Sequence, residues 1–300
     1  MRTKFLKANV QGGVGNQLFC YFAGFFTASR LSKELEVNTS LVGISGANHG
    51  YTIDGFGLPG KFSGVTRKIR CFRNFSLRVD NGLARRSRYY RFFRLSIMKT
   101  YTSTEIGYDI NLDKITNLNA ITGYFQTYKY FQQISNLQSF QLWPSNPSTW
   151  FINSIKMIEN QSPYALHIRR GDYLLEDKFG ILGTGYYLNA IAVLDEVKGK
   201  NPIAVFSDDY EAARRVLSPL NQDRLIFMES SRPEHPLETI VLMSKCSAVV
   251  IANSTFSWWG AILNKSEKAT VICPSKWFKE MSDPIDLIPS HWIKVESVWG

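Results

Sequence analysis

The second half of the chain alternates short apolar runs with helix-like segments, and this alternation limits the fold more than any other feature. Strands are predicted at 164–168, 203–206, 225–228, 248–252 and 271–273, and helices at 149–159, 186–197, 211–217, 236–245 and 256–263. Short apolar strands that alternate with helices form parallel sheets with right-handed crossovers and helices on both faces. We therefore expect a Rossmann-like α/β domain in this half.

The N-terminus has the opening of a nucleotide-binding fold. An apolar run at 5–10 is followed by a glycine-rich turn and a predicted helix at 18–31. The turn lacks the dinucleotide-binding fingerprint, because Leu18 stands where the third glycine is required. Its glycines still let a phosphate or sugar approach the backbone at a helix start. The candidate binding residues here are Gly13, Gly15 and Asn16, and an ordinary tight turn capped by Asn16 is the alternative.

We expect two domains, 1–148 and 149–300. The proposed linker is Trp143-Pro-Ser-Asn-Pro-Ser-Thr-Trp150, in which two prolines and small polar residues separate apolar segments. A chain of 300 residues is long enough for two hydrophobic cores.

Polar side chains follow three predicted strands of the second half. They are Arg169, Arg170 and Asp172 after the first strand, Ser207, Asp208 and Asp209 after the next, and Asn253, Ser254 and Thr255 after a third. The carboxyl ends of parallel strands meet at one edge, so these residues should face one crevice. Arginine holds phosphate through two parallel hydrogen bonds, and a capped helix start adds backbone N–H groups. The pattern predicts an anion site.

The presence of two carboxylates beside a phosphate site needs a separate explanation. Asp208 and Asp209 could accept hydrogen bonds from a base with adjacent N–H donors, as guanine has, which predicts a guanine nucleotide diphosphate. Two alternatives stay open: both could cap the following helix, or Asp209 and Glu211 could form a metal-ligand pair. His167 lies inside a strand next to the arginines, as either a ligand contact or a buried core residue.

The charge of the chain favours anionic partners. The net charge is +10, and residues 67–99 hold eleven Lys or Arg against one acid, Asp80, with aromatic residues interleaved. We interpret 67–99 as a surface that meets an anionic partner such as the inner leaflet of the membrane. A solvated basic face with inward aromatics, or an RNA-binding segment, is the alternative.

The remaining features indicate a soluble, cytoplasmic protein. The four cysteines show neither C-x-x-C nor metal spacing, and Cys246 and Cys273 lie in apolar runs, as buried small hydrophobes do in a reducing compartment. The basic N-terminus is interrupted by glycines before a signal-peptide core can form, and no segment reaches the roughly 18 apolar residues of a membrane span.

Five motifs resemble, in order and spacing, those of the bacterial α-1,2-fucosyltransferases of glycosyltransferase family 11. They are Gly12-Gly-Val-Gly-Asn-Gln17, Gly123-Tyr-Phe-Gln126, His167-Ile-Arg-Arg-Gly-Asp-Tyr173, Phe206-Ser-Asp-Asp209 and Ile251-Ala-Asn-Ser-Thr-Phe-Ser-Trp-Trp-Gly260. The resemblance covers nearly the whole chain and is weakest over about 43–118. The third and fifth motifs together are highly specific.

The resemblance implies a GT-B type α/β fold with two Rossmann-like domains, the first on the acceptor side and the second binding a GDP-sugar. It implies an inverting, metal-independent transferase without a cofactor, which moves L-fucose from GDP-β-L-fucose to the 2-hydroxyl of a galactose. The expected acceptor is a galactose-containing oligosaccharide, such as a lipid-linked glycan precursor at the inner membrane. We expect its identity to depend on residues 43–130.

The resemblance also assigns roles to residues. Arg169 and Arg170 would hold the diphosphate, and His167 and Asp208 would contact guanine. The set Asn253, Ser254 and Thr255 would line the phosphates and sugar, while the glycine turn of the first domain would close over fucose. Asp172 is the nearest carboxylate for a general base, or else the ion-pair partner of an arginine.

Two departures from the family pattern stand out. Val14 replaces the usual leucine, which should have no effect. Thr239 stands where an acidic residue is common, so the role of that acid is in doubt unless Glu238 takes it.

Two rival interpretations remain. One is a transferase of another GDP-sugar or another linkage. The other is a non-catalytic basic protein that binds RNA or anionic lipid.

Overall fold

The chain forms two compact units. The computed structural model describes residues 4–42, 53–64, 79–80, 82–134, 140, 142–144, 146–171, 173, 177–230, 236–264 and 269–300. The first unit comprises Met1–Leu142 and Pro284–Pro289, and the second comprises Trp143–Asp283 and Ser290–Gly300. The division precedes the expected one at 148–149, because Trp143 packs edge-on against Phe151 of the second unit, with ring centroids 5.1 Å apart.

The first unit contains a five-stranded sheet in the order β3-β2-β1-β5-β4, and every strand pair is parallel. The strands are β1 (Phe5–Asn9), β2 (Glu34–Asn38), β3 (Lys61–Ser63), β4 (Thr100–Thr102) and β5 (Ala120–Thr122). The helices are α1 (Val14–Arg30), η1 (Ile53–Phe56), α3 (Arg88–Ser96), α4 (Ile110–Asp113) and α5 (Lys129–Gln132).

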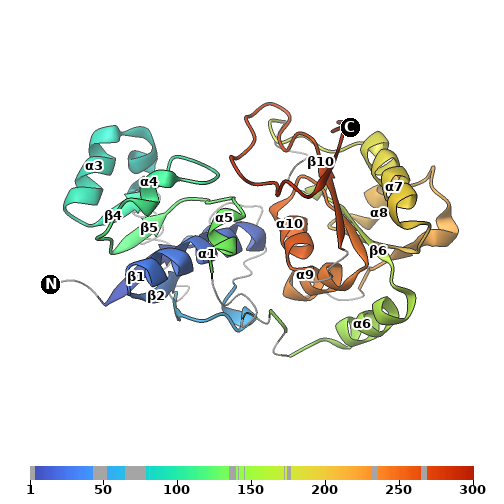
Figure 1. Ribbon diagram of the computed structural model, residues 1–300, viewed down its shortest axis with the longest axis horizontal. Coiled ribbons are helices and arrows are strands. Elements are labelled where there is room, and N and C mark those ends of the chain that lie inside the picture. Colours follow the sequence, from blue (N-terminus) through green and yellow to red (C-terminus); the bar gives the residue numbers. More distant parts are fainter. Residues whose placement is uncertain are drawn as a thin grey trace. The chain divides into compact units, whose positions relative to one another are not determined.

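Helix α1 packs along β1 and β2 (Figure 1). It begins at Val14, four residues before the predicted start, because Gly13 is its N-cap residue and Gly15 already lies inside it. A Cβ atom at Gly24 would collide with the side chain of Ala8 in β1. Glycine at this position therefore lets the helix lie close to the sheet.

A short strap from the C-terminal part of the chain completes the first unit. In residues 284–289, the carbonyl of Asp286 accepts hydrogen bonds from Thr127 Oγ1 (2.8 Å) and from the backbone N–H of Tyr128 (3.1 Å). The Asp286 carboxylate pairs with Lys129 Nζ at 2.6 Å. Gly107 leaves room for the strap, since a Cβ there would lie 2.6 Å from the carbonyl oxygen of Ile285.

The second unit contains a six-stranded sheet in the order β11-β10-β9-β6-β7-β8, again parallel throughout. Its strands are β6 (Tyr164–Ile168), β7 (Ile203–Ser207), β8 (Leu225–Phe227), β9 (Ala248–Val250), β10 (Thr270–Pro274) and β11 (Ile293–Val295). Its helices are α6 (Thr149–Gln161), α7 (Thr184–Lys198), α8 (Tyr210–Val216), η4 (Gln222–Arg224), α9 (Pro236–Lys245) and α10 (Thr255–Ile262).

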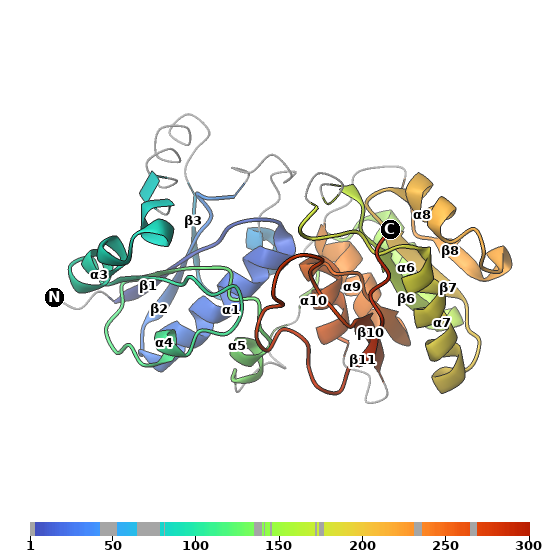
Figure 2. The same cartoon turned by 90° about the horizontal axis from the view of Figure 1, so that it is seen from above.

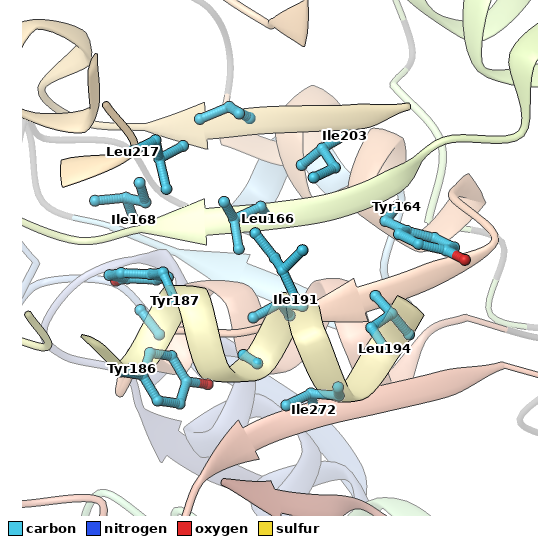
Figure 3. Packing of buried hydrophobic residues seen from close by; sticks show 14 of the residues in the cluster. Tyr164, Leu166, Ile168, Tyr186, Tyr187, Ile191, Leu194, Ile203, Leu217 and Ile272 are labelled. Atoms are coloured by element: carbon cyan, nitrogen blue, oxygen red, sulfur yellow. The ribbon is translucent and has the colours of Figure 1, made fainter. Parts of the chain in front are cut away.

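The predicted alternation of strands and helices in this half is confirmed. All five residues of β6 are buried, as expected of a strand with helices over both faces. Figure 3 shows one side of this core, where Tyr186, Ile191 and Leu194 of α7 lie against the strands. On another side, α9 packs against α6 and α10 (Figure 2).

Two further sequence expectations can be compared with the structure. Cys246 and Cys273 are buried free thiols, as predicted. Among the described helices, none is both long and apolar enough to cross a lipid bilayer.

We predict that Gly107→Ala destabilises the first unit by about 1–3 kcal/mol, because the new methyl group meets strap backbone that cannot yield as a side chain would. All seven tryptophans lie at position 143 or later and outside the strap. Urea unfolding followed by circular dichroism should therefore shift more than unfolding followed by tryptophan fluorescence.

Gly82→Ala is the matched control. Gly82 lies in a helical stretch, and a Cβ atom there would meet no other atom within 4 Å. It should be neutral or stabilise by up to about 1 kcal/mol. Equal behaviour of the two variants would contradict the packing argument.

Candidate active site

The topology of the second sheet defines where a ligand crevice can form. From β6 the chain runs through β7 and β8 to one edge, and it then returns to build β9, β10 and β11 on the other side of β6. The connections therefore diverge between the neighbouring strands β6 and β9. In open α/β sheets, ligands bind outside the carboxyl ends of the strands at such a switch point. Two of the predicted site segments, at 169–170 and 253–255, follow these two strands.

Arg169 is held by Asp208 across the ends of β6 and β7. Its Nη1 lies 2.9 Å from Asp208 Oδ2, and a quarter of each side chain is exposed. The guanidinium also lies 5.4 Å from the centre of the Tyr173 ring. These contacts orient the charged fork at the sheet edge while leaving part of it accessible to an anion.

Arg170 is held differently from its neighbour. Its backbone N–H donates to Asp208 Oδ1 (2.9 Å), and its buried guanidinium donates through Nη1 to the carbonyl of Leu182, just before α7 (2.9 Å). This side chain thus connects the end of β6 to the start of α7. Its predicted contact with a diphosphate stays a prediction.

His167 is buried behind the arginines. Its ring centre lies 5.7 Å from that of Phe256 in α10. Burial, with the charge of Arg169 adding to it, lowers the pKa of His167 to about 3, so the imidazole is neutral at pH 7. Its Nδ1 is buried without a hydrogen-bond partner in the described part of the chain. A neutral imidazole can donate or accept a hydrogen bond with a nucleotide base, but it carries no charge that would attract a phosphate.

The two aspartates after β7 have different surroundings. Asp208 accepts from both arginines, as described above, so the structure uses its oxygens to fix the cationic groups. Asp209 is the N-cap residue of α8, where its Oδ1 accepts from the N–H of Ala212 (2.9 Å). For Asp209 the capping alternative is therefore observed. Contacts of either residue with guanine stay predictions.

The segment after β9 combines tethering with a capped helix start. The buried Asn253 donates through Nδ2 to the carbonyls of Phe179 and Gly180, both at 3.1 Å, and its own carbonyl accepts from the Tyr173 hydroxyl at 3.1 Å. Ser254 is the N-cap residue of α10 and Thr255 is the first residue of that helix. The Nδ2 group of Asn253 thus ties the backbone at 179–180 to the segment after β9, and its predicted contact with the phosphates and sugar stays a prediction.

The glycine turn of the first unit lies at the switch point of its own sheet, between β1 and β5. Gln11 Nε2 donates to the carbonyl of Gly123 (3.1 Å), and Gln126 Nε2 donates to Asn16 Oδ1 (2.9 Å). Gly12 has a φ of +74°, and a Cβ there would lie 2.9 Å from Asn16 Nδ2. Of the predicted residues, Gly13 is the N-cap residue of α1, and Gly15 and Asn16 lie in the first turn of that helix.

Asp172 and Glu238 are two residues whose roles the sequence leaves open. Asp172 lies outside the described residues. Glu238, at the start of α9, is buried and accepts from the N–H (2.6 Å) and hydroxyl (2.7 Å) of Ser148, the N-cap residue of α6. Glu238 therefore joins two helix starts within the second unit. Across the described residues, no group of three His, Cys, Asp or Glu side chains is arranged to hold a metal ion.

Comparison with known proteins identifies the family. The family model described as "Glycosyl transferase family 11" matches residues 88–295, more than half of the chain. The chain belongs to glycosyl transferase family 11. This membership makes the protein a glycosyltransferase, and it disfavours a non-catalytic RNA- or lipid-binding role.

Two relatives from Escherichia coli show how far the similarity extends. The chain is 27% identical over 297 residues to an alpha-1,2-colitosyltransferase, covering 96% of this chain and 98% of that one. It is 44% identical over 124 residues to the O-antigen biosynthesis glycosyltransferase WbnK. In that second match the chain spans 40% of the relative's length and the match covers 40% of this chain.

A solved structure confirms the fold. The FUT1 mutant of Arabidopsis thaliana in complex with GDP has a TM-score of 0.51 at 12% identity, with 92% of this chain and 72% of that chain covered. At 12% sequence identity, this structural similarity supports the fold and nothing further. With two units of parallel sheet and flanking helices, the family 11 chain has the predicted GT-B type of fold.

Sequence reasoning overlooked several residues that organise this site. Tyr173 reaches from beside Arg169 to Asn253, and Phe256 covers His167. The signal for both was their place inside the two most specific motifs. Leu182 contributes a backbone carbonyl, which no side-chain pattern could have indicated.

We predict a pH signature for His167. The folded imidazole stays unprotonated above about pH 3, whereas in the unfolded chain it takes up a proton below its ordinary pKa near 6.5. Acid therefore favours the unfolded state, and the stability linked to His167 falls as the pH drops from about 6 to 4. Relative to His167→Leu, the wild type should lose roughly 1.4 kcal/mol more per pH unit in this window.

Tryptophan fluorescence in urea at several pH values checks this, because all tryptophans belong to the second unit. His167→Asn should change the pH dependence in the same way as His167→Leu, even if their stabilities at pH 7 differ. Parallel pH profiles for wild type and both variants would contradict a neutral, buried histidine.

Proposed function

We propose that this glycosyltransferase moves L-fucose from GDP-β-L-fucose to the 2-hydroxyl of a galactose, with inversion at the transferred carbon. The proposed acceptor is a galactose in a cell-surface glycan precursor such as a lipid-linked O-antigen repeat, handled on the cytoplasmic side of the membrane. Support comes from the family membership and from two relatives, one named an alpha-1,2-colitosyltransferase and one named for O-antigen biosynthesis.

The observation that carries the proposal is the Arg169 fork held by Asp208 at the switch point of the second sheet. The arginine is already oriented before any ligand arrives. The capped start of α10 follows the neighbouring strand β9 and offers backbone N–H groups on the same edge. A diphosphate suits this combination. The Nδ1 of the neutral His167, which has no hydrogen-bond partner among the described residues, suits a base or a sugar hydroxyl.

The proposed chemistry depends on charge at the leaving group. The bond between C1 of the sugar and the phosphate oxygen breaks, and the electron pair leaves with GDP as the sugar becomes oxocarbenium-like. The acceptor oxygen bonds to C1 from the opposite face and its proton goes to a base. Donors fixed in advance stabilise the growing negative charge more in the transition state than in the ground state.

Asp172 has two candidate roles, and one of them is the general base for the acceptor hydroxyl. Asp172 follows the arginines and is the nearest carboxylate in sequence. It could take the proton of the acceptor hydroxyl or pair with an arginine. A transition state with most of the C1–O bond already broken needs only a weak base. We propose that cationic side chains, rather than a metal ion, neutralise the pyrophosphate.

Colitose is a second candidate for the donor sugar. The relative that matches over nearly its whole length is named for colitose, which lacks one hydroxyl of fucose. A site that hydrogen-bonds this hydroxyl discriminates strongly against the sugar without it, whereas an apolar site does not. Competition between the two GDP-sugars at equal concentration separates these cases.

Incubation of the full chain with GDP-fucose and a panel of β-galactosides, with EDTA present, tests the proposed function. We expect an α-1,2-linked product on galactose and release of GDP. Linkage analysis of the product decides the regiochemistry. Absence of turnover with every GDP-sugar and no thermal stabilisation by GDP would overturn the proposal.

Arg169→Ala should lower kcat by about 10²–10³, because it removes the donor that we propose stabilises the leaving diphosphate. Arg169→Lys keeps the charge but loses the fork, so it should recover only part of the rate. Initial rates at saturating donor, with GDP binding measured in parallel, check both. The exposed Arg215 of α8 provides the control, since Arg215→Ala should match the wild type. Near-normal turnover in Arg169→Ala would show that the site is misplaced.

A further inference from the structure

Helix α3 has its polar and apolar sides reversed relative to an ordinary surface helix. Its one buried side chain is an arginine, Arg94, which pairs with Asp80 (3.1 Å) and donates to Thr102 Oγ1 in β4 (2.7 Å). Three of its four aromatic residues are exposed instead: Tyr89 is 88% exposed, Phe92 72% and Phe93 50%. Surface helices of soluble domains normally bury the apolar stripe. The alternative in which the aromatic residues of 67–99 pack inward is therefore wrong for these three.

The exposed apolar surface extends beyond the helix. Among the described residues, seven of the twelve large hydrophobic side chains that are exposed fall between positions 79 and 98. Besides the three aromatics they are Val79, Leu83, Ile97 and Met98. Positions 89, 92, 93 and 97 recur at helical spacing, so they share one side of α3. Clustering of this kind marks an interaction surface, whereas single exposed hydrophobics need no explanation.

The same surface is positively charged. Arg86 and Arg88, which come just before the aromatic residues in the sequence, are exposed. Asp80, the one acidic residue of 79–99 in the sequence, already binds Arg94 and accepts from the Tyr90 hydroxyl. We call the side chains of Arg86, Arg88, Tyr89, Phe92, Phe93 and Ile97 the α3 face. It combines cationic side chains with protruding apolar ones and has no acid of its own.

The chemistry of the α3 face selects its partner. A second copy of the chain would bring arginines against arginines, which repel. An anionic bilayer attracts the arginines to lipid phosphates and lets the aromatic rings enter the boundary between headgroups and acyl chains, as interfacial helices do. We infer that the α3 face docks the first unit onto an anionic lipid surface. This goes beyond the proposed function and does not depend on the identity of the donor sugar.

Vesicle flotation with the full chain tests the inference in the absence of any substrate. Phosphatidylcholine vesicles containing phosphatidylglycerol should bind the protein, and vesicles of phosphatidylcholine alone should bind it much more weakly. High salt should reduce the binding, since the attraction of exposed charges is screened. Equal binding to both kinds of vesicle would overturn the role of the arginines.

Two sets of variants separate the apolar and the ionic contributions. Tyr89→Ser combined with Phe92→Ser and Phe93→Ser should weaken binding about tenfold or more, through lost insertion. Arg86→Glu combined with Arg88→Glu should weaken it by about 25-fold or more, at about fivefold per charge. These side chains are exposed, and the proposed GDP site belongs to the second unit, so circular dichroism and thermal stabilisation by GDP should stay unchanged.

The controls carry the same chemistry at exposed positions of the second unit. Val197→Ser on α7 and Arg215→Glu on α8 should leave vesicle binding unchanged. Equal loss in controls and α3 variants would overturn the inference. So would a loss of self-association in the α3 variants without any effect on vesicles, or binding to single-stranded RNA by a wild type that ignores vesicles.

Discussion

The bond pattern around one carboxylate holds the proposed donor site together. Asp208 leaves the end of β7 and accepts from the side chain of Arg169 and from the backbone of Arg170 at the end of β6. Gly171 makes this approach feasible: its φ is +23°, and a Cβ there would collide with Asp208 Oδ2. The two strand ends are thereby locked to each other before a ligand arrives. Preorganised charge is what a reaction with a charged leaving group requires.

The same arrangement explains why two adjacent arginines differ. A carboxylate that grips the fork of Arg169 and the backbone of Arg170 turns the second side chain inward, where it meets the carbonyl before α7. One arginine then faces the ligand edge, and the other secures the helix that covers the sheet. Adjacent arginines therefore differ in their partners, one pairing with a carboxylate and the other with a backbone carbonyl, which two identical letters in a sequence do not reveal.

The sequence supported the second sheet well because its inner strands are short apolar runs that alternate with helices. The weaker strands β3, β4 and β11 escaped prediction, since each has only three residues and their sequences, such as Lys-Phe-Ser and Ile-Lys-Val, mix polar with apolar residues. Strand β2, Glu-Leu-Glu-Val-Asn, pairs in a parallel sheet yet alternates charge with aliphatic residues. Pairing with β1 rather than local pattern determines it.

The sequence indicates which segments belong to the candidate site, but not which side chains bond to one another. Parallel strands imply that 169–170, 207–209 and 253–255 lie at one edge of the sheet. Asp208 contacts Arg169 and Arg170 there, and the carbonyl of Asn253 accepts from the hydroxyl of Tyr173, whose ring lies beside Arg169. Which oxygen accepts from which nitrogen depends on backbone directions after each strand. For this reason the capping role of Asp209 was only one of three open interpretations, and the Leu182 carbonyl was not foreseen. The exposed side of helix α3 was likewise not predicted, because composition does not tell which face of a helix is buried.

The strap at 284–289 has a consequence for how the protein is made. The first unit begins at the N-terminus, yet its hydrogen bonds to Tyr128 and Thr127 come from residue 286. On the ribosome this unit therefore cannot acquire these contacts until residue 286 has been synthesised, well after the rest of the unit. A gene truncated after residue 142 would likewise encode an incomplete first unit, so folding of the first unit depends on translation of the chain that forms the second.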